Sequence, residues 1–255
     1  MDLFWLPLGA GGHFVRWNGR VYEWWSARRQ HRAAADLYHC GLLLSLDNIT
    51  YAVEMGPVWN VSGADRGVLA EGPVGSKWLG RFRAFRYEMR CWPGGCIPDI
   101  AEAVDSPLRT TEDPTRVAAV LNVLPEIPVL TWGRDELGAG EMWNSNSAVA
   151  WALARTGHDM VAIGPPPGGR APGWTAGLVL ASRQAGAMRS DCESSAEGQG
   201  AKGPGGGRRR SPCDGGNPLL GPAVWAVCTR RCDAPSTVAG RWTFRARRTR
   251  RCPRP

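Results

Sequence analysis

The sequence predicts an α+β protein in which an antiparallel sheet packs on one central helix. Residues 37–55 alternate between apolar and other side chains around a short turn, as in a β-hairpin. Residues 81–90 alternate in the same way and predict a third strand. Residues 145–156 are apolar over most of a helical circumference, so this helix should be buried. We expect one globular domain at residues 1–184.

The hairpin at residues 37–55 is the clearest local prediction. Asp47-Asn48 is expected as a two-residue turn, which pairs Leu46 with Ile49. Because strand side chains alternate with period two, one face of the hairpin is then wholly apolar. On the other face His39 and Glu54 become diagonal neighbours, within reach of each other. The apolar face consists of Cys40, Leu42, Leu44, Leu46, Ile49, Tyr51, Val53 and Met55.

The remaining elements of the first half are shorter. A hairpin is expected over residues 14–25, because Asn18-Gly19 is a strong turn signal. The Arg- and Ala-rich residues 26–35 predict a helical segment. The Gly-rich residues 56–80 are expected to be mainly loop, and residues 97–104 to form a short helix.

Two helices are predicted in the second half. Asp113-Pro114 places an N-cap before a proline at the first helical position, so a helix should cover residues 114–124. The central helix should end near Thr156, with Gly157 as its C-terminal cap. Residues 174–183 are expected as a last helical or extended piece packed on the domain.

Residues 185–255 differ in composition and are expected to form a disordered tail. They hold 14 Lys and Arg against 5 Asp and Glu, whereas residues 1–184 hold 17 against 18. The net charge of +8 therefore belongs to the tail. Nucleic acid, or an anionic surface, is expected as a partner only through this tail, and only weakly.

Compartment and cofactors follow from what the sequence contains. Residues 1–9 carry no basic segment and include Pro7, so they do not read as a secretory signal. No apolar run approaches the length of a membrane span. Three cysteines in residues 1–184 do not make a disulfide framework. We expect a cytoplasmic protein with reduced thiols, no cofactor and no metal site; the oligomeric state is left open.

A polar tetrad, Asn144-Ser-Asn-Ser147, opens the central helix. One explanation is N-capping, in which these side chains satisfy the unpaired N–H groups of the first turn. That explanation accounts for the residues without any chemistry.

A second explanation comes from a resemblance. A histidine at the start of a hairpin strand, a polar residue on the next strand and an Asn-Cys-type tetrad opening a helix are similar to the circularly permuted papain-like proteins. These include lecithin retinol acyltransferase-like proteins and bacterial cell-wall hydrolases. The matching residues are His39, Asn144, Ser145, Asn146 and Val149, and the resemblance covers residues 37–156.

The resemblance implies a hydrolase or acyltransferase acting on an amide or ester. Ser145 would be the nucleophile, His39 its general base and Glu54 the group that orients His39. Asn144 or Asn146 would hold an oxyanion. However, the family's nucleophile is cysteine, and a serine hydroxyl depends on a neighbouring base to react. A catalytically inactive binding or structural domain with the same fold is therefore the alternative.

Overall fold

The computed structural model describes residues 1–8, 23–58, 67–97 and 99–199. Within these residues seven strands form a sheet with the order β4-β5-β3-β2-β1-β6, and β7 pairs beside β2. The pairs along this order are antiparallel, whereas β7 runs parallel to β2. The predicted α+β class with an antiparallel sheet is confirmed. The strands are β1 (Asp2–Pro7), β2 (Asp36–Leu46), β3 (Ile49–Pro57), β4 (Val68–Pro73), β5 (Arg86–Pro93), β6 (Val104–Arg109) and β7 (Gly169–Arg170).

The predicted hairpin is confirmed in its register. β2 pairs with β3 so that Leu46 lies opposite Ile49 and Leu42 opposite Val53. Asp47 and Asn48 have φ angles of 51° and 61°, the left-handed conformation that a tight hairpin turn requires. Asp and Asn adopt this conformation more readily than most side chains, which is why the pair forms the turn.

The sheet has two different faces. Alternate residues of β2, among them Cys40 and Leu42, pack against helix residues in one large buried cluster. We call this side the helix face. On the opposite side, the outer face, Phe4 and Leu6 of β1 form a small cluster with Ile97.

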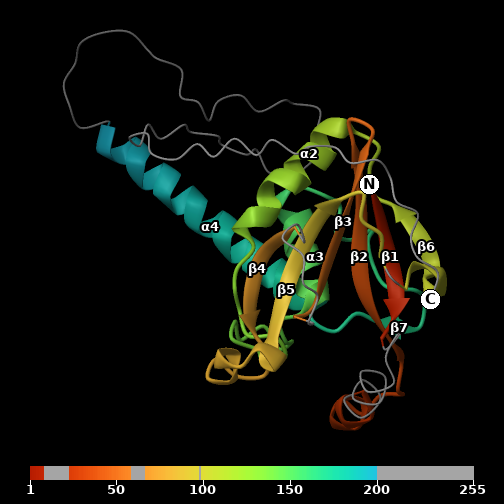
Figure 1. Ribbon diagram of the computed structural model, residues 1–255. Coiled ribbons are helices and arrows are strands. Elements are labelled where there is room, and N and C mark those ends of the chain that lie inside the picture. The colour runs from red at the N-terminus through yellow and green to blue at the C-terminus, as the bar shows by residue number, and fades with distance from the viewer. Residues whose placement is uncertain (9–22, 59–66, 98, 200–255) are drawn as a thin grey trace. The chain divides into compact units, whose positions relative to one another are not determined.

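The helices α2 (Pro114–Val123) and α3 (Ser145–Arg155) cover the helix face, as Figure 1 shows. Both helices were predicted at these positions. The side chain of Asp113 accepts a hydrogen bond from the backbone N–H of Thr115, which caps α2 as expected. Every residue from Ser145 to Leu153 is buried, which explains the apolar circumference of α3.

Helix α4 extends from Trp174 to Gln199. The expected domain boundary after residue 184 therefore lies inside a helix. Good helix formers continue past that point, including Ala185, Ala187 and Met188. Residues 200–255, the larger part of the expected tail, lie outside the described residues.

Several other expectations are corrected. Residues 23–29 are helical, so the second strand expected to end at residue 25 is wrong there, and most of that hairpin lies outside the described residues. Residues 68–73, expected in a loop, form β4. The strand expected at residues 81–90 begins only at Arg86, because two 3-10 turns take up the residues before it. The short helix expected at residues 97–104 is a single 3-10 turn that ends before β6 begins. In the part of the chain that the structure describes, the 3-10 turns are η1 (Leu79–Arg81), η2 (Arg83–Phe85), η3 (Ile100–Glu102) and η4 (Leu124–Glu126).

Among the described residues, no helix is both long and apolar enough to cross a membrane.

Candidate functional site

The polar tetrad at the start of α3 forms a complete capping box. The side-chain oxygen of Asn144 accepts hydrogen bonds from the backbone N–H groups of Asn146 (2.9 Å) and Ser147 (3.3 Å). In return, the Ser147 hydroxyl accepts a hydrogen bond from the backbone N–H of Asn144 at 3.1 Å. The first turn of α3 is thereby closed by its own side chains.

The same side chains also tie α3 to two other segments. The amide nitrogen of Asn146 donates to the carbonyl oxygens of Tyr38 and Pro172, each at 2.9 Å. Asn144 donates to the Pro172 carbonyl at 2.8 Å. The amide groups of the tetrad thus join α3 to the start of β2 and to the segment before α4.

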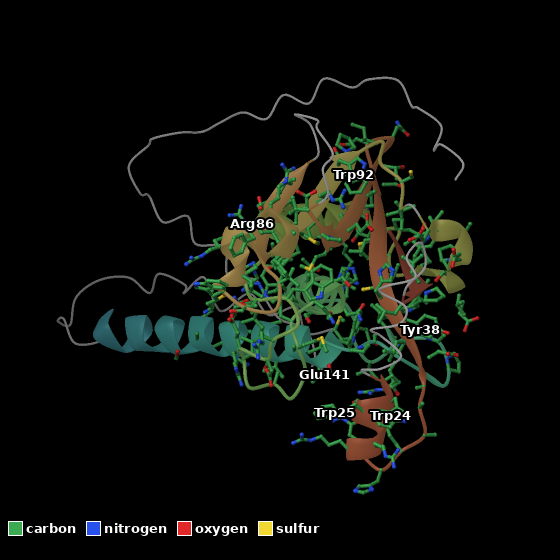
Figure 2. The ribbon with its side chains drawn as sticks, turned by 60° about the horizontal axis from the view of Figure 1, so that its bottom comes forward. Trp24, Trp25, Tyr38, Arg86, Trp92 and Glu141 are labelled. Atoms are coloured by element: carbon green, nitrogen blue, oxygen red, sulfur yellow. The ribbon has the colours of Figure 1, made fainter. Side chains whose placement is uncertain are left out.

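The backbone of Gly173 packs closely against the side chains of this network. Its φ angle is +89°, and an added Cβ would lie 2.5 Å from Asn144 Oδ1 and 2.7 Å from Ser147 Oγ. Ser147 Oγ donates to the Gly173 carbonyl at 2.7 Å. Glu141, labelled in Figure 2, accepts hydrogen bonds from the backbone N–H groups of Gly173 and Thr175 at 3.1 and 3.0 Å. A side chain at position 173 would displace these contacts.

Ser145 is the member of the tetrad that takes no part in these contacts. It is buried, and its hydroxyl makes no hydrogen bond to another described residue. Since α3 packs on the helix face, Ser145 belongs to that side of the sheet.

His39 projects from the other side. It lies opposite Leu6 in the β1–β2 pair, and Leu6 belongs to the outer-face cluster. Its strand neighbours Tyr38 and Cys40 both point into the core on the helix face. Burial lowers the pKa of His39 to about 4, and the negative charge of Asp99 opposes this shift. The imidazole is therefore neutral at pH 7.

Glu54 shares the outer face with His39, as the hairpin register predicts. Glu54 lies directly opposite Arg90 in the β3–β5 pair. Burial raises the pKa of Glu54, while Arg90 lowers it and Asp99 raises it. Oε2 of Glu54 has no hydrogen-bond partner among the described residues. Arg90 also lies 3.4 Å from the carboxylate of Glu88, which is almost fully buried.

The structure thus places two of the three expected catalytic residues on the same face of the sheet. His39 and Glu54 both lie on the outer face, and the charge of Asp99 acts on each of them. Ser145, with Asn144 and Asn146, lies on the helix face. We call the outer-face group the polar cluster; it consists of His39, Glu54, Glu88, Arg90 and Asp99.

Sequence reasoning missed the last three members of the polar cluster. The alternation of residues 81–90 does place Glu88 and Arg90 on one side of a strand, which was the available signal. Pairing that strand with β3 could not be read from the pattern. Asp99 follows a segment with no strand periodicity, so nothing in the sequence indicated it.

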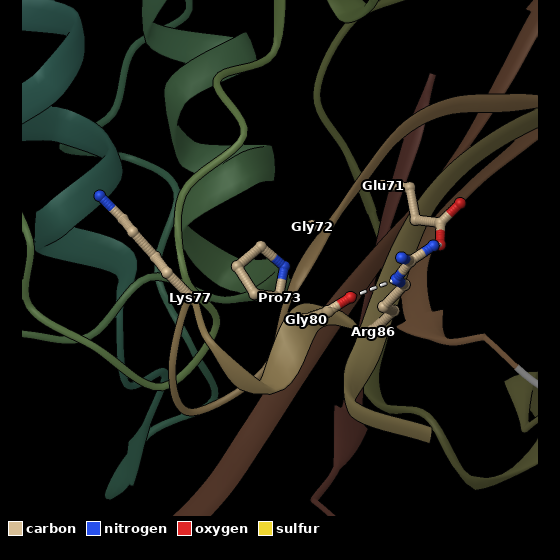
Figure 3. A pocket seen from close by; sticks show the side chains of 6 residues that line it. All are labelled: Glu71, Gly72, Pro73, Lys77, Gly80 and Arg86. Carbon is tan, nitrogen blue, oxygen red and sulfur yellow. Dashed lines mark hydrogen bonds and ion pairs between the residues drawn. The ribbon is translucent and has the colours of Figure 1, made fainter. Parts of the chain in front are cut away.

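Two cavities lie elsewhere among the described residues. One, of about 360 Å³, lies between β4 and the start of β5 (Figure 3), where Arg86 reaches both the Gly80 carbonyl and Glu71. A second, of about 570 Å³, is lined by polar residues that include Lys77, Thr131 and Glu136. His39, Glu54 and Ser145 line neither of them.

The described residues contain no group of three His, Cys, Asp or Glu side chains arranged to hold a metal ion. Burial raises the pKa of Cys91 to about 11 and raises that of Cys40 further, so neither free thiol is activated. Cys96 is disulfide-bonded, which corrects the expectation of reduced thiols for that residue.

Comparison of the chain with protein-family models, with curated proteins and with solved structures finds no match.

Proposed function

We propose that the domain is a binding or structural domain that does not catalyse through Ser145. One observation supports this most strongly: the strand that carries His39 directs it to the outer face, whereas α3 carries Ser145 on the helix face. A serine hydroxyl needs a base within hydrogen-bond reach to become a nucleophile. With the sheet between them, His39 does not supply that base.

The contacts of the tetrad support the same proposal. An oxyanion-binding side chain must have a donor free to face the substrate. The amide hydrogens of Asn146 both go to backbone carbonyls, and one amide hydrogen of Asn144 goes to the Pro172 carbonyl. These contacts favour N-capping and tertiary anchoring over an oxyanion hole.

The permuted papain-like arrangement remains a proposal about the framework. A strand with His39, a strand with Glu54 and then a helix opened by a polar tetrad occur in the order that the resemblance implies. In this proposal the domain keeps the order of elements and lacks the pairing of nucleophile and base. Hydrolysis of an amide or ester through Ser145 is the competing proposal.

A fluorophosphonate probe separates the two proposals. The full-length protein is treated with the labelled probe, and labelled peptides are identified by mass spectrometry. We expect no label on Ser145, and the same result for His39→Ala. Label on Ser145 that disappears in His39→Ala, but persists in the exposed control Ser45→Ala, would establish the enzyme instead. Hydrolysis of a p-nitrophenyl ester gives a second readout on the same variants.

A further inference from the structure

The connection from β4 to β5 exposes aromatic rings beside positive charges. Residues 74–86 contain four Lys and Arg side chains and no acidic residue, and two of the four pair with carboxylates outside the segment, Lys77 with Glu136 and Arg86 with Glu71. Trp78 is 59% exposed and Phe82 48% exposed, and Phe85 is exposed as well. Large apolar side chains that cluster on a surface mark a contact site more often than scattered ones do.

Two 3-10 turns, η1 and η2, hold these rings in place. Trp78 and Phe82 meet edge to face with centroids 5.8 Å apart, and the guanidinium of Arg81 lies 4.5 Å from the Trp78 ring. At the base of the connection, Arg86 is held by the Gly80 carbonyl and by Glu71 at 3.1 Å. The exposed rings are therefore presented by an ordered segment.

A second segment also combines exposed aromatic rings with arginine side chains. Residues 23–29 form a helical segment on which Trp24 and Trp25 are exposed, the former by 57% (Figure 2). Arg28 and Arg29 cover their rings at 5.1 and 5.3 Å.

The buried side of this segment fixes it to the domain. Glu23 forms ion pairs with Arg32 and with Arg170 of β7, the latter at 3.2 Å. Ala27 is buried as well. The exposed tryptophans are thus on the outside of an anchored helix.

The strand register places both segments at one end of the sheet. The helical segment leads into the start of β2, and the β4–β5 connection leads into the start of β5. Because β2 and β5 both pair antiparallel with β3, their first residues lie at the same end, as Figure 1 shows. We call this the Trp–Arg end, defined by residues 23–29 and 77–86.

We propose that the Trp–Arg end docks on the surface of an anionic membrane. Tryptophan and phenylalanine partition into the headgroup region, where the ring is buried and polar atoms stay hydrated. Lysine and arginine beside them are attracted to acidic headgroups, each contributing about 1 kcal/mol near the surface. The inference goes beyond the proposed function and does not depend on it, because Ser145 and the polar cluster are not involved.

The geometry favours a lipid surface over a single-stranded nucleic acid. Nucleic-acid strands bind in charged grooves in which open ring faces stack on bases. Here a guanidinium group already lies over one face of each of the rings of Trp24, Trp25 and Trp78. The rings are also carried on two projecting segments, which suits a flat surface better than a strand.

Radical footprinting of the full-length protein tests the proposal residue by residue. Vesicles of phosphatidylcholine mixed with phosphatidylglycerol should protect Trp78, Phe82 and Trp24 from oxidation by threefold or more. Vesicles of phosphatidylcholine alone and soluble glycerophosphoglycerol should not. Val161, which is 98% exposed, is the internal control and should stay reactive. This local readout separates the Trp–Arg end from charge-driven binding by residues 185–255.

Two matched variants complete the test. Phe82→Ser should lower the fraction of protein that sediments with the mixed vesicles by about tenfold, whereas Val161→Ser should not change it. Both positions are exposed, so unchanged circular dichroism is expected for each. Three outcomes would overturn the proposal: no protection at Trp78 and Phe82 with mixed vesicles, sedimentation of Phe82→Ser equal to that of Val161→Ser, or protection by a single-stranded oligonucleotide instead of vesicles.

Discussion

His39 and Ser145 lie on opposite sides of one sheet. His39 pairs with Leu6 and faces the outer side, while Ser145 begins a helix that packs on Cys40 and Leu42. Neighbouring strand residues alternate between faces, so a shift of one residue in β2 would reverse this relation. The register of the hairpin therefore determines whether His39 lies on the same side of the sheet as Ser145, where it could act as a base.

Asn146→Ala should lower the free energy of unfolding by about 2 kcal/mol, because the carbonyls of Tyr38 and Pro172 would lose a buried donor. Urea unfolding followed by circular dichroism measures the change. Asn122→Ala is the matched control: this side chain is exposed on α2, so the loss should stay within about 0.5 kcal/mol. Equal stability of the two variants would contradict the anchoring role of Asn146.

The local parts of the fold could be predicted from the sequence. The hairpin register followed from Asp47-Asn48 and a period of two, and the start of α2 from Asp113-Pro114. Each depends on residues within a few positions of one another. Such signals act through backbone geometry and capping, which neighbouring residues alone determine.

The long-range parts could not be predicted. The wholly apolar face of the hairpin is the one that packs with α3, but the pattern did not indicate that Leu43 on the other face would pack against the outer-face cluster of Phe4, Leu6 and Ile97. The pairing of Glu54 with Arg90 joins segments that are far apart in the chain. Periodicity within each strand gives its two faces, but the choice of partner depends on the packing of the whole domain.

Stability should fall as the pH decreases from about 6.5 toward 4. Burial lowers the pKa of His39 to about 4, compared with an ordinary value near 6.5. In that range the unfolded chain binds a proton that the folded protein excludes, which favours unfolding as the pH falls. Above about pH 6.5 the titration of His39 does not reduce the stability of the folded protein. Acidification from there toward pH 4 lowers the free energy of unfolding by about 2–3 kcal/mol.

Comparison with His39→Gln isolates this effect in urea titrations at several pH values. The charge of Asp99 acts on both His39 and Glu54. The raised pKa of Glu54 affects stability with the opposite sign, since the folded protein binds that proton at a higher pH than the unfolded chain does. The variant should therefore lose less stability on acidification than the wild type. His31→Asn, at an exposed position, should keep the wild-type dependence. Parallel curves for wild type and His39→Gln would refute the prediction.

Arg90→Met should be the most destabilising change in the polar cluster, by about 3 kcal/mol. The substitution removes the cation opposite Glu54 and the guanidinium 3.4 Å from Glu88, and a half-buried carboxylate is costly without its counter-charge. Adding Glu54→Gln to Arg90→Met should recover part of the loss, because one of the charges is then gone. Urea unfolding at pH 7 measures all three proteins.

The control for Arg90 is an ion pair at the surface. Lys77 lies 3.3 Å from Glu136 with most of its side chain exposed, so Lys77→Met should cost less than about 1 kcal/mol. Water compensates that carboxylate when the lysine is removed, whereas the outer face gives Glu54 little such access. If Arg90→Met proved no more destabilising than Lys77→Met, the cation at position 90 would not be holding the polar cluster together.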